Sequence, residues 1–280
     1  MERRPPGRDE VILAENLEAL PRFAGESFQL IYIDPPFNTG QRQTRRTLAT
    51  TPDEHGDRTG FAGRRYATEL LAQSSYADEF EDYLGFLEPR LREAHRLLAH
   101  SGTFYVHSDP RESHYVKLLL DEVFGRECFL NEIVWAYDYG ARTKRRWPAK
   151  HDTILVYVKD PAAYFFDSEA VDREPYMAPG LVTAEKAARG KLPTDVWWHT
   201  IVPTNGREKT GYPTQKPEGV LRRIVQASTA EGDWCLDFFA GSGTLGAVAV
   251  QLGRRYVLID ENPEAVAVMQ ARLGAGEKRP

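Results

Sequence analysis

The sequence predicts an α/β fold with a mostly parallel sheet. Three observations support this fold class: short apolar runs alternate with amphipathic stretches, one apolar run stops at two prolines, and another leads into a glycine-rich turn. Strands that alternate with helices build parallel sheets whose two faces are covered by helices. A chain of 280 residues can form one large domain of this kind with a small appended lobe.

Apolar periodicity and turn residues place the elements of the first half of the chain. They are a strand running into a helix at 11–20, a strand at 28–33, a helix at 83–98, a strand at 103–107, a helix at 113–123, and strands at 132–135 and 153–158. The run Phe28–Ile33 (FQLIYI) is almost continuously apolar, which is typical of a buried parallel strand. Gly102 is expected to end the helix before the next strand. Residues 39–75 are polar with little apolar periodicity, so we expect a basic loop insertion there.

The second half of the chain begins after a stretch without clear periodicity. Residues 160–195 carry several prolines and scattered aromatic residues, and we interpret them as a small irregular lobe. The adjacent Trp197 and Trp198 are interpreted as packing residues rather than as a platform for a base. The elements expected next are a helix at 217–227, a strand at 234–238, a helix at 245–252, a strand at 256–259 and a helix at 263–273.

The net charge of −5 argues against a protein that coats nucleic acid over its whole surface, yet two segments are locally basic. The second of them also contains an aromatic residue, Trp147, which could stack on a base. Each segment is either a solvated loop or a surface for phosphate groups. The basic residues are Arg42, Arg45, Arg46, Arg58, Arg64 and Arg65 in the first segment and Arg142, Lys144, Arg145, Arg146 and Lys150 in the second.

The two cysteines and the hydropathy pattern indicate a cytoplasmic protein. Cys128 and Cys235 are far apart in apolar surroundings, so we expect buried thiols and no metal site. No apolar run approaches the ~18 residues that a membrane span requires. We therefore expect a soluble protein of the cytoplasm.

The segment 234–262 is typical of a nucleoside-cofactor site. Gly241 and Gly243 allow a tight turn and close approach of a ligand, and Asp260, placed 23 positions after Asp237, can accept hydrogen bonds from ribose hydroxyls. A dinucleotide fold would build further strands behind this unit, but only 20 residues follow Asp260. A carboxylate at Asp237 would also repel a pyrophosphate, whereas it suits a cationic amino-acid tail.

The tetrapeptide Asp34-Pro35-Pro36-Phe37 follows the apolar strand, at the end where parallel sheets bind ligands. The amino nitrogen of adenine or cytosine is a poor nucleophile because its lone pair is delocalised into the ring. The Asp34 carboxylate and the Pro35 carbonyl can accept both of its N–H bonds and weaken that conjugation. The prolines fix the backbone, and Phe37 offers a face on which an extruded base can stack.

With these segments the chain resembles the β-class DNA amino-methyltransferases, which include modification subunits of some restriction systems. In that family a D-P-P-[YF] segment precedes an F-x-G-x-G segment, as Asp34–Phe37 precedes Phe239–Gly243 here. Glu15 is a departure, because the family often has Asp before Asn-Leu. Further matches are NLEAL, DYLGFLEPRL, GTFYVHSD, NEIVW, KHDTILVY and TQKP.

The resemblance implies a seven-stranded, Rossmann-like methyltransferase sheet in circularly permuted order. Residues 1–159 would form the catalytic half, 160–195 the target-recognition lobe and 196–280 the cofactor-binding half. The expected reaction transfers a methyl group from S-adenosylmethionine, without a metal, to N6 of an adenine flipped out of double-stranded DNA, and leaves S-adenosylhomocysteine. Phe238 is expected to face the sulfonium through a cation–π contact.

The expected site residues fall into three groups. Catalysis is assigned to Asp34, Pro35, Pro36 and Phe37. Cofactor binding is assigned to Thr214, Lys216, Asp237, Phe238, Ala240, Gly241, Gly243, Thr244 and Asp260. Contacts to nucleic acid are assigned to Arg45, Arg46, Arg64, Arg65, Arg142, Lys144, Arg145 and Arg146.

Several alternatives stay open. Aspartate at the first position of the tetrapeptide favours adenine, since cytosine-N4 enzymes of the family more often carry Ser. The alternatives are cytosine-N4 methylation of DNA, methylation of an RNA amino group, and a non-catalytic DNA-binding partner subunit. A homodimer, and a restriction or specificity subunit as partner, are further expectations.

Overall fold

The computed structural model describes residues 3–38, 43–52, 58–59, 65–76, 80–140, 142–203 and 205–274. The chain divides into two units. The larger unit comprises residues 1–35 and 84–280, and the smaller unit comprises residues 36–83.

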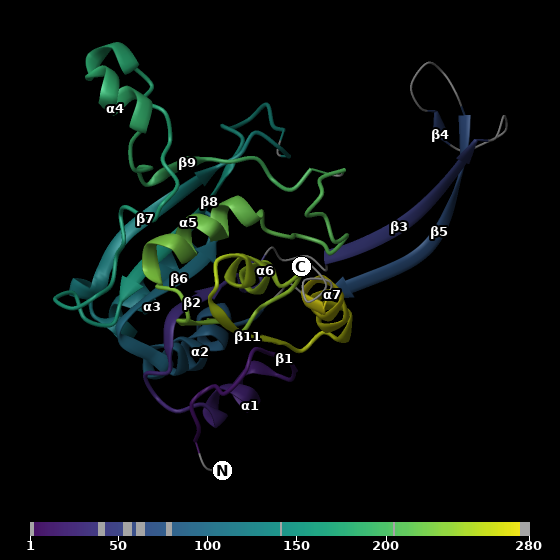
Figure 1. The fold of residues 1–280 in the computed structure, drawn as a ribbon. Coiled ribbons are helices and arrows are strands. Elements are labelled where there is room, and N and C mark those ends of the chain that lie inside the picture. Colours follow the sequence, from purple (N-terminus) through teal and green to yellow (C-terminus); the bar gives the residue numbers. More distant parts are fainter. Residues whose placement is uncertain are drawn as a thin grey trace. The chain divides into compact units, whose positions relative to one another are not determined.

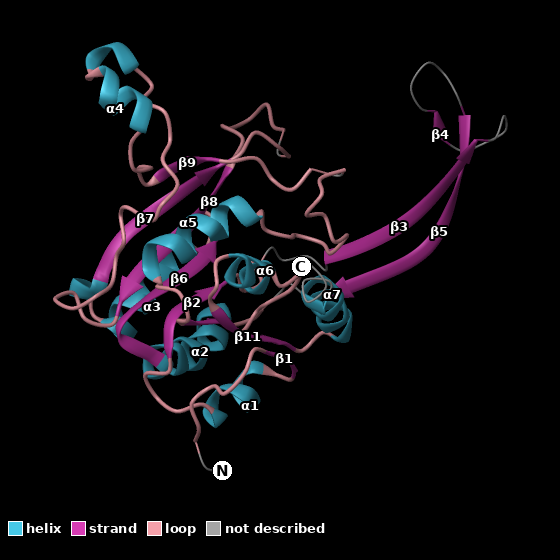
Figure 2. Ribbon diagram, in the orientation of Figure 1, coloured by secondary structure: helices cyan, strands magenta, loops and turns pink. Residues whose placement is uncertain are grey.

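The larger unit is built on an eight-stranded sheet (Figures 1 and 2). Its order is β1 (Glu10–Leu13), β11 (Arg255–Asp260), β10 (Trp234–Asp237), β2 (Phe28–Ile33), β6 (Leu98–Ser108), β8 (His151–Val158), β7 (Phe129–Ala136) and β9 (Val196–Trp198). Only β8 runs antiparallel to its neighbours in this sheet. The α/β fold with a mostly parallel sheet is confirmed. One strand more than expected is present, because the short β9 adds to the edge beside β7.

The order of the strands brings distant parts of the chain together. Strands β10 and β11, from the C-terminal part, insert between β1 and β2 from the N-terminal part. The glycine-rich turn after β10 and the tetrapeptide after β2 therefore follow neighbouring strands, although about two hundred residues separate them along the chain. The permuted order predicted for the sheet brings the two motifs to one edge.

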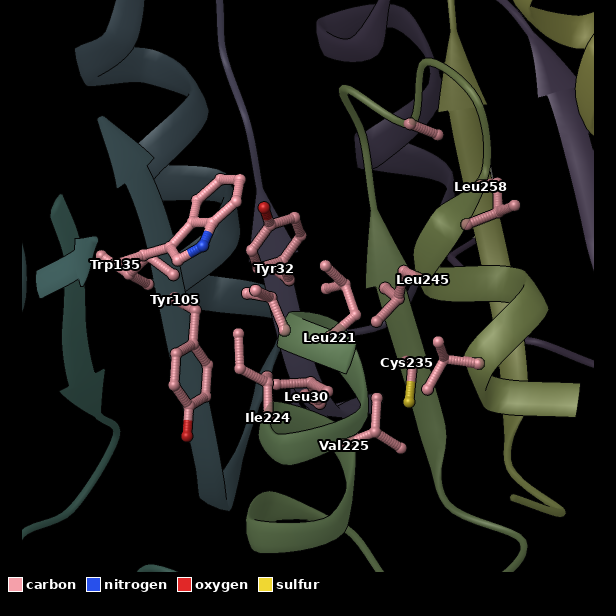
Figure 3. Packing of buried hydrophobic residues seen from close by; sticks show 14 of the residues in the cluster. Leu30, Tyr32, Tyr105, Trp135, Leu221, Ile224, Val225, Cys235, Leu245 and Leu258 are labelled. Atoms are coloured by element: carbon pink, nitrogen blue, oxygen red, sulfur yellow. The ribbon is translucent and has the colours of Figure 1, made fainter. Parts of the chain in front are cut away.

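Helices cover both faces of the sheet (Figure 2). One face packs against α5, α6 and α7, whose apolar residues share a cluster with Leu30, Tyr32 and Tyr105 of the sheet (Figure 3). The other face packs against α2 and α3, where the ring of Phe124 stacks on that of Phe104 at 5.2 Å. The helices are α1 (Asn16–Ala19), α2 (Tyr83–Leu97), α3 (Ser113–Phe124), α4 (Ala184–Arg189), α5 (Glu218–Ser228), α6 (Thr244–Gln251) and α7 (Pro263–Gly274).

Gly102 does not end a helix as expected. Helix α2 stops at Leu97 and β6 begins at once with Leu98, so Gly102 lies inside the strand. A Cβ at Gly102 would lie 2.8 Å from the Leu98 Cδ1 atom and 2.9 Å from the Ala99 carbonyl oxygen. The glycine therefore allows a close local bend of the strand, a role that resembles a helix stop in the sequence.

The expectation of a loop over residues 39–75 is wrong for the stretches 43–52, 58–59 and 65–75, which the structure describes as strands. The smaller unit contains a three-stranded antiparallel sheet in the order β3 (Gln43–Pro52), β5 (Arg65–Tyr76), β4 (Arg58–Thr59). These strands lack the regular apolar alternation that marks a half-buried strand. Their threonines and tyrosines, which favour extended backbone, were the signal that could have identified them.

The lobe at 160–195 has little regular structure, as expected, apart from α4 and a short 3-10 turn at Pro179–Leu181. An ion pair and a backbone hydrogen bond join it to helix α5 of the same unit. The Asp172 carboxylate pairs with Arg222 at 2.9 Å, and the backbone N–H of Asp167 donates to the Ala227 carbonyl at 2.8 Å. These contacts hold the lobe without a core of its own.

Candidate functional site

Three neighbouring strands of the large sheet lead to aspartates at one edge. Asp34 follows the last residue of β2, Asp237 is the last residue of β10, and Asp260 is the last residue of β11. The three strands are parallel neighbours, so their carboxyl ends meet at the edge where such sheets bind ligands. The sequence analysis named all three residues, and the structure brings them together.

Asp34 forms an ion pair with Lys216, which lies just before α5. The Lys216 ammonium donates to Asp34 Oδ2, and the two side chains are only 18% and 10% exposed for Asp34 and Lys216 respectively. The other carboxylate oxygen, Oδ1, is buried and has no hydrogen-bond partner among the residues that the structure describes. A buried acceptor without a donor is costly, so this oxygen is suited to accept an N–H bond from a bound substrate.

The tetrapeptide falls on the division between the two units. Asp34 and the buried Pro35 belong to the larger unit, and Pro36 and Phe37 belong to the smaller one. The structure therefore places the tetrapeptide within the larger unit only as far as Pro35. The stacking of a base on Phe37 stays a prediction.

The glycine-rich turn after β10 has the backbone that the sequence predicts. Gly241 and Gly243 have φ angles of +50° and +70°, and a Cβ at Gly243 would lie 2.7 Å from Met269 Cγ. The N–H of Gly241 donates to Asp260 Oδ2 at 2.8 Å, so this carboxylate shapes the turn directly. Burial raises the pKa of the Asp260 carboxyl, and backbone N–H groups oppose that shift.

Thr244, the first residue of α6, joins the turn to the lysine. Its hydroxyl donates to the backbone carbonyl of Lys216 at 3.1 Å, and Arg272 of α7 donates to the same hydroxyl oxygen at 3.2 Å. Thr244 and Lys216, two of the residues expected around the cofactor, are therefore directly connected. The N–H of Ala240 donates to Ile259 of β11 at 3.1 Å.

Asp237 is buried in a region rich in negative charge. Burial holds the pKa of its carboxyl well above the usual range, and the nearby Asp34 and Asp260 carboxylates raise it further. The N–H of Phe239, at 3.0 Å from Oδ1, and the ammonium of Lys216 act in the opposite direction. Three carboxyl groups therefore lie around a single ammonium at this edge, and a cation bound there would favour their ionised forms. Such a site favours a cationic ligand.

Two other predicted cofactor residues are placed less directly. Phe238 is 1% exposed, while the partly exposed Phe239 lies with its ring 6.1 Å from that of Phe86. Thr214 is exposed at a φ angle of +53°, and the neighbouring Gln215 is buried instead. The Gln215 amide donates to the Glu208 carbonyl at 2.6 Å and accepts from Thr210, which fixes the loop before Lys216.

The sequence analysis did not assign a role to Asn16 and Arg90. The Asn16 amide donates to the carbonyl of Phe238 at 3.2 Å, and the Arg90 guanidinium donates to Asn16 Oδ1 at 2.7 Å and to Glu15 at 2.6 Å. This chain of bonds holds the end of β10 against α1 and α2. The signals for it were the matched NLEAL segment and an arginine in an amphipathic helix. Glu15, which departs from the family pattern, serves as the partner of Arg90.

The second basic segment is the loop between β7 and β8, residues 137–150. Strands β7 and β6 both run antiparallel to β8, so β7 points in the same direction as β2, and the loop starts from the edge that carries the aspartates. Trp147 is 94% exposed. The predicted contact residues in this loop are all exposed: Arg142, Lys144, Arg145 and Arg146.

The other predicted contacts lie in the smaller unit. Arg65 is exposed in β5, Arg45 and Arg46 lie in β3, and Arg64 falls outside the described residues. In the larger unit, the packing role of Trp197 is confirmed, because it is 7% exposed. For Trp198 the prediction was wrong: it is 76% exposed at the end of β9, next to Ala136 and the start of the basic loop.

Among the described residues, no group of three or more histidines, cysteines, aspartates or glutamates could hold a metal ion. Likewise, none of the helices in that part of the chain has the length and apolar character for crossing a membrane.

The family of this chain follows from its match to a family model described as DNA methylase, which covers residues 28–271. The chain belongs to the N6/N4 DNA methylase family. Type II methyltransferase M.HpaI from Haemophilus parainfluenzae is 30% identical to this methylase over 266 residues, or 95% of this chain and 74% of the relative. DNA adenine methyltransferase YhdJ from Escherichia coli (strain K12) is 30% identical over 271 residues, or 94% of this chain and 82% of the relative.

Solved structures share the fold of this methylase. PvuII DNA methyltransferase (cytosine-N4-specific) matches with a TM-score of 0.66 at 16% identity, over 96% of this chain and 87% of that one. The M1.HpyAVI complex with S-adenosylmethionine matches with a TM-score of 0.61 at 19% identity, over 94% and 98%. The resemblance inferred from the motifs is confirmed at the level of family and fold.

Proposed function

We propose that this methylase transfers a methyl group from S-adenosylmethionine to N6 of adenine in DNA, with the base turned out of the duplex. The observation that supports the proposal most directly is the environment of the two carboxylate oxygens of Asp34. One of its carboxylate oxygens is held by Lys216, and the other is a buried acceptor without a partner in the described part of the chain. An amino group placed there would donate one N–H to Asp34 and the other to the Pro35 carbonyl, which makes its nitrogen lone pair more available for attack.

The residues at the strand ends fit S-adenosylmethionine, which supplies an electrophilic methyl group when bound. The two left-handed glycines allow backbone to approach the ligand, and the cluster of three carboxyl groups suits a cation. Asp260 would hold the ribose, and Asp237 the cationic amino-acid part. Lys216, linked to the turn through Thr244, would lie near the methionine carboxylate.

Adenine is the preferred base for two reasons. The tetrapeptide begins with aspartate, as is usual in adenine enzymes of the family, and a relative of 30% identity is named a DNA adenine methyltransferase. Cytosine-N4 is the second candidate, because one structural relative is named for that specificity. Methylation of RNA and a non-catalytic partner role have no comparable support.

The test of this function is methyl transfer from labelled S-adenosylmethionine to unmethylated genomic DNA, followed by digestion and mass spectrometry of the nucleosides. We expect N6-methyladenine. N4-methylcytosine would preserve the chemistry and overturn the choice of base. If no product forms on DNA although the cofactor binds, RNA or a missing partner subunit becomes the leading explanation.

The basic loop between β7 and β8 is proposed as the main DNA-binding surface of the larger unit, because it starts from the edge of the active site and is exposed. We expect the double variant Arg145→Ala/Arg146→Ala to weaken DNA binding. The slope of log affinity against log salt concentration should fall by about 2, roughly one for each lost phosphate contact. Fluorescence anisotropy with a short duplex over a salt series measures this slope.

A matched control is the double variant Arg92→Ala/Arg126→Ala. Arg126 is exposed just before β7, at the opposite edge of the sheet, and Arg92 is exposed and contacts Glu122 near the end of α3. The control variant also removes two positive charges, yet it should leave the slope of log affinity against log salt concentration nearly unchanged. Equal slopes for both double variants would show that the loop has no special role.

The proposed homodimer and partner subunit are tested separately by sedimentation of the protein with and without DNA.

A further inference from the structure

Three buried polar side chains and the partly buried Tyr137 form a continuous row of hydrogen bonds across the sheet beside Asp34. The hydroxyl of Tyr32 in β2 lies 2.9 Å from His107 Nδ1 in β6. His107 Nε2 lies 3.0 Å from Asp152 Oδ2 in β8, and the hydroxyl of Tyr137 donates to Asp152 Oδ1 at 2.8 Å. His107 is fully buried, and Tyr32 and Asp152 are 2% and 7% exposed.

The row has one consistent arrangement of protons when the imidazole is neutral. An ionised carboxylate only accepts hydrogen bonds, so His107 Nε2 carries a hydrogen and donates to Asp152. The His107 Nδ1 atom then accepts from the hydroxyl of Tyr32. Burial, followed by the nearby Asp34, Asp237 and Asp152 carboxylates, raises the pKa of Tyr32 well above its usual value, so its hydroxyl stays a donor.

The row lies next to the ion pair of the active site. Tyr32 lies on β2 two positions before Asp34, which directly follows the strand, and the Asp34 carboxylate is close enough to raise the pKa of Tyr32. The last residue pair of β2 and β6 is Ile33 with Val106, so Asp34 and His107 follow side by side. The charge of Lys216 also reaches Asp152, where it supports the ionised carboxylate against the cost of burial.

Burial of polar side chains in a row of this kind is not the usual way to stabilise a core. The surrounding cluster is apolar, and apolar side chains of similar size usually pack a core as well as a buried polar network does. A buried network that is fully hydrogen-bonded does, however, fix the orientation of its members. The polar residues occur at the end of the sheet that carries the aspartates, which is where a fixed orientation matters for catalysis.

We propose that Tyr32, His107 and Asp152 are positioning residues for methyl transfer. They hold the end of β2 and the Asp152 carboxylate near Lys216 in place. In this way they keep Asp34 Oδ1 oriented toward the amino group of the target base. None of them needs to touch the base or the cofactor. This inference rests on the proposed role of Asp34.

The test compares two tyrosines that are partners in the sheet. Tyr32 and Tyr105 pair in register on β2 and β6, are almost fully buried, and make one hydrogen bond each through the hydroxyl, Tyr105 with Ser228 at 2.7 Å. Figure 3 shows their hydroxyls pointing in opposite directions. Tyr32→Phe and Tyr105→Phe each remove one hydroxyl and keep the ring, so both lose a comparable amount of stability.

The two variants should differ in turnover. Tyr32→Phe is expected to lower kcat about tenfold while KM for DNA and for S-adenosylmethionine stays within about twofold. Tyr105→Phe should keep kcat within about twofold of the wild type. Asp152→Asn, which removes the charge at the other side of His107, should lower kcat in the same way as Tyr32→Phe. Thermal unfolding of each variant measures the structural effect separately.

Full turnover of both Tyr32→Phe and Asp152→Asn, or an equal loss in Tyr105→Phe, would overturn the inference. Asp34→Asn in the same assay separates this outcome from failure of the proposed function. If Asp34→Asn is inactive and Tyr32→Phe is fully active, only the positioning role is wrong. If Asp34→Asn is active, the catalytic assignment itself is wrong.

Discussion

Asp34→Asn should lose about 10²–10³-fold or more in kcat while still binding S-adenosylmethionine with nearly unchanged affinity. Asparagine has the same shape, but its amide is a weaker acceptor than a carboxylate and can present a donor to the amino group. The ammonium of Lys216 loses its partner, yet Asp152 and Asp237 remain within reach of its charge. Single-turnover kinetics and calorimetric titration with the cofactor measure the two quantities.

Asp121→Asn is the matched control for this experiment. Asp121 pairs with Lys117 on α3 at 2.7 Å, and its side chain is 20% exposed, close to the 18% of Asp34. It also accepts from the hydroxyl of Tyr157 at 2.6 Å. Its loss should reduce stability and leave kcat intact. Substantial turnover by Asp34→Asn would contradict the catalytic role of the tetrapeptide, whatever the control shows.

The elements that frame the site could be predicted from the sequence because their signals are local. An almost continuously apolar run identifies β2, and apolar residues at 220, 221, 224 and 225 mark the buried side of α5. The two glycines of the turn reveal a left-handed backbone. Strand pairing then follows from the family resemblance, which places β10 beside β2.

Contacts between distant residues could not be predicted in the same way. Lys216 and Asp34 are separated by 182 positions, and the bonds of His107 to Tyr32 and Asp152 join residues 75 and 45 positions apart. The motifs around Asp34 and Lys216 do not show that the two residues pair, and the segments around Tyr32, His107 and Asp152 carry no local sign of their hydrogen bonds. Only the register of β2, β6 and β8 brings Tyr32, His107 and Asp152 side by side. The sequence therefore predicts the reactive residues at this edge of the sheet, but not the hydrogen-bond network of Tyr32, His107 and Asp152 beside them.

The strands of the smaller unit were not predicted for a different reason, which lies in their local sequence pattern. Residues 43–76 contain polar residues in an order without the period of either a helix or a half-buried strand, so the pattern favoured a loop. Backbone pairing between β3 and β5 does not require apolar alternation. Strand preference of threonine was a weaker signal than the absence of periodicity, and the expectation followed the stronger one.

Asp237→Asn is expected to stabilise the protein without ligand and to weaken cofactor binding. The folded-state pKa of Asp237 is raised, mainly by burial, so the protonated group adds stability below the unfolded pKa of about 4 and this stability is lost as pH rises through the folded value. Above the unfolded pKa this carboxyl group therefore costs stability. Asparagine removes that cost and can still accept from the N–H of Phe239.

The free energy of unfolding of Asp237→Asn should exceed that of the wild type by about 1–3 kcal/mol at pH 7, and the difference should shrink toward pH 4. Affinity for S-adenosylmethionine should fall about 10–100-fold, because a charge-assisted hydrogen bond to the cation is lost. Asp233→Asn is the control: this residue lies just before the other end of β10 and accepts from the N–H of Ala230 at 2.8 Å. If Asp237→Asn lost both stability and affinity, the carboxylate would be structural; a gain in stability with a loss of affinity means that this edge of the sheet holds unfavourable negative charge that a cationic ligand neutralises.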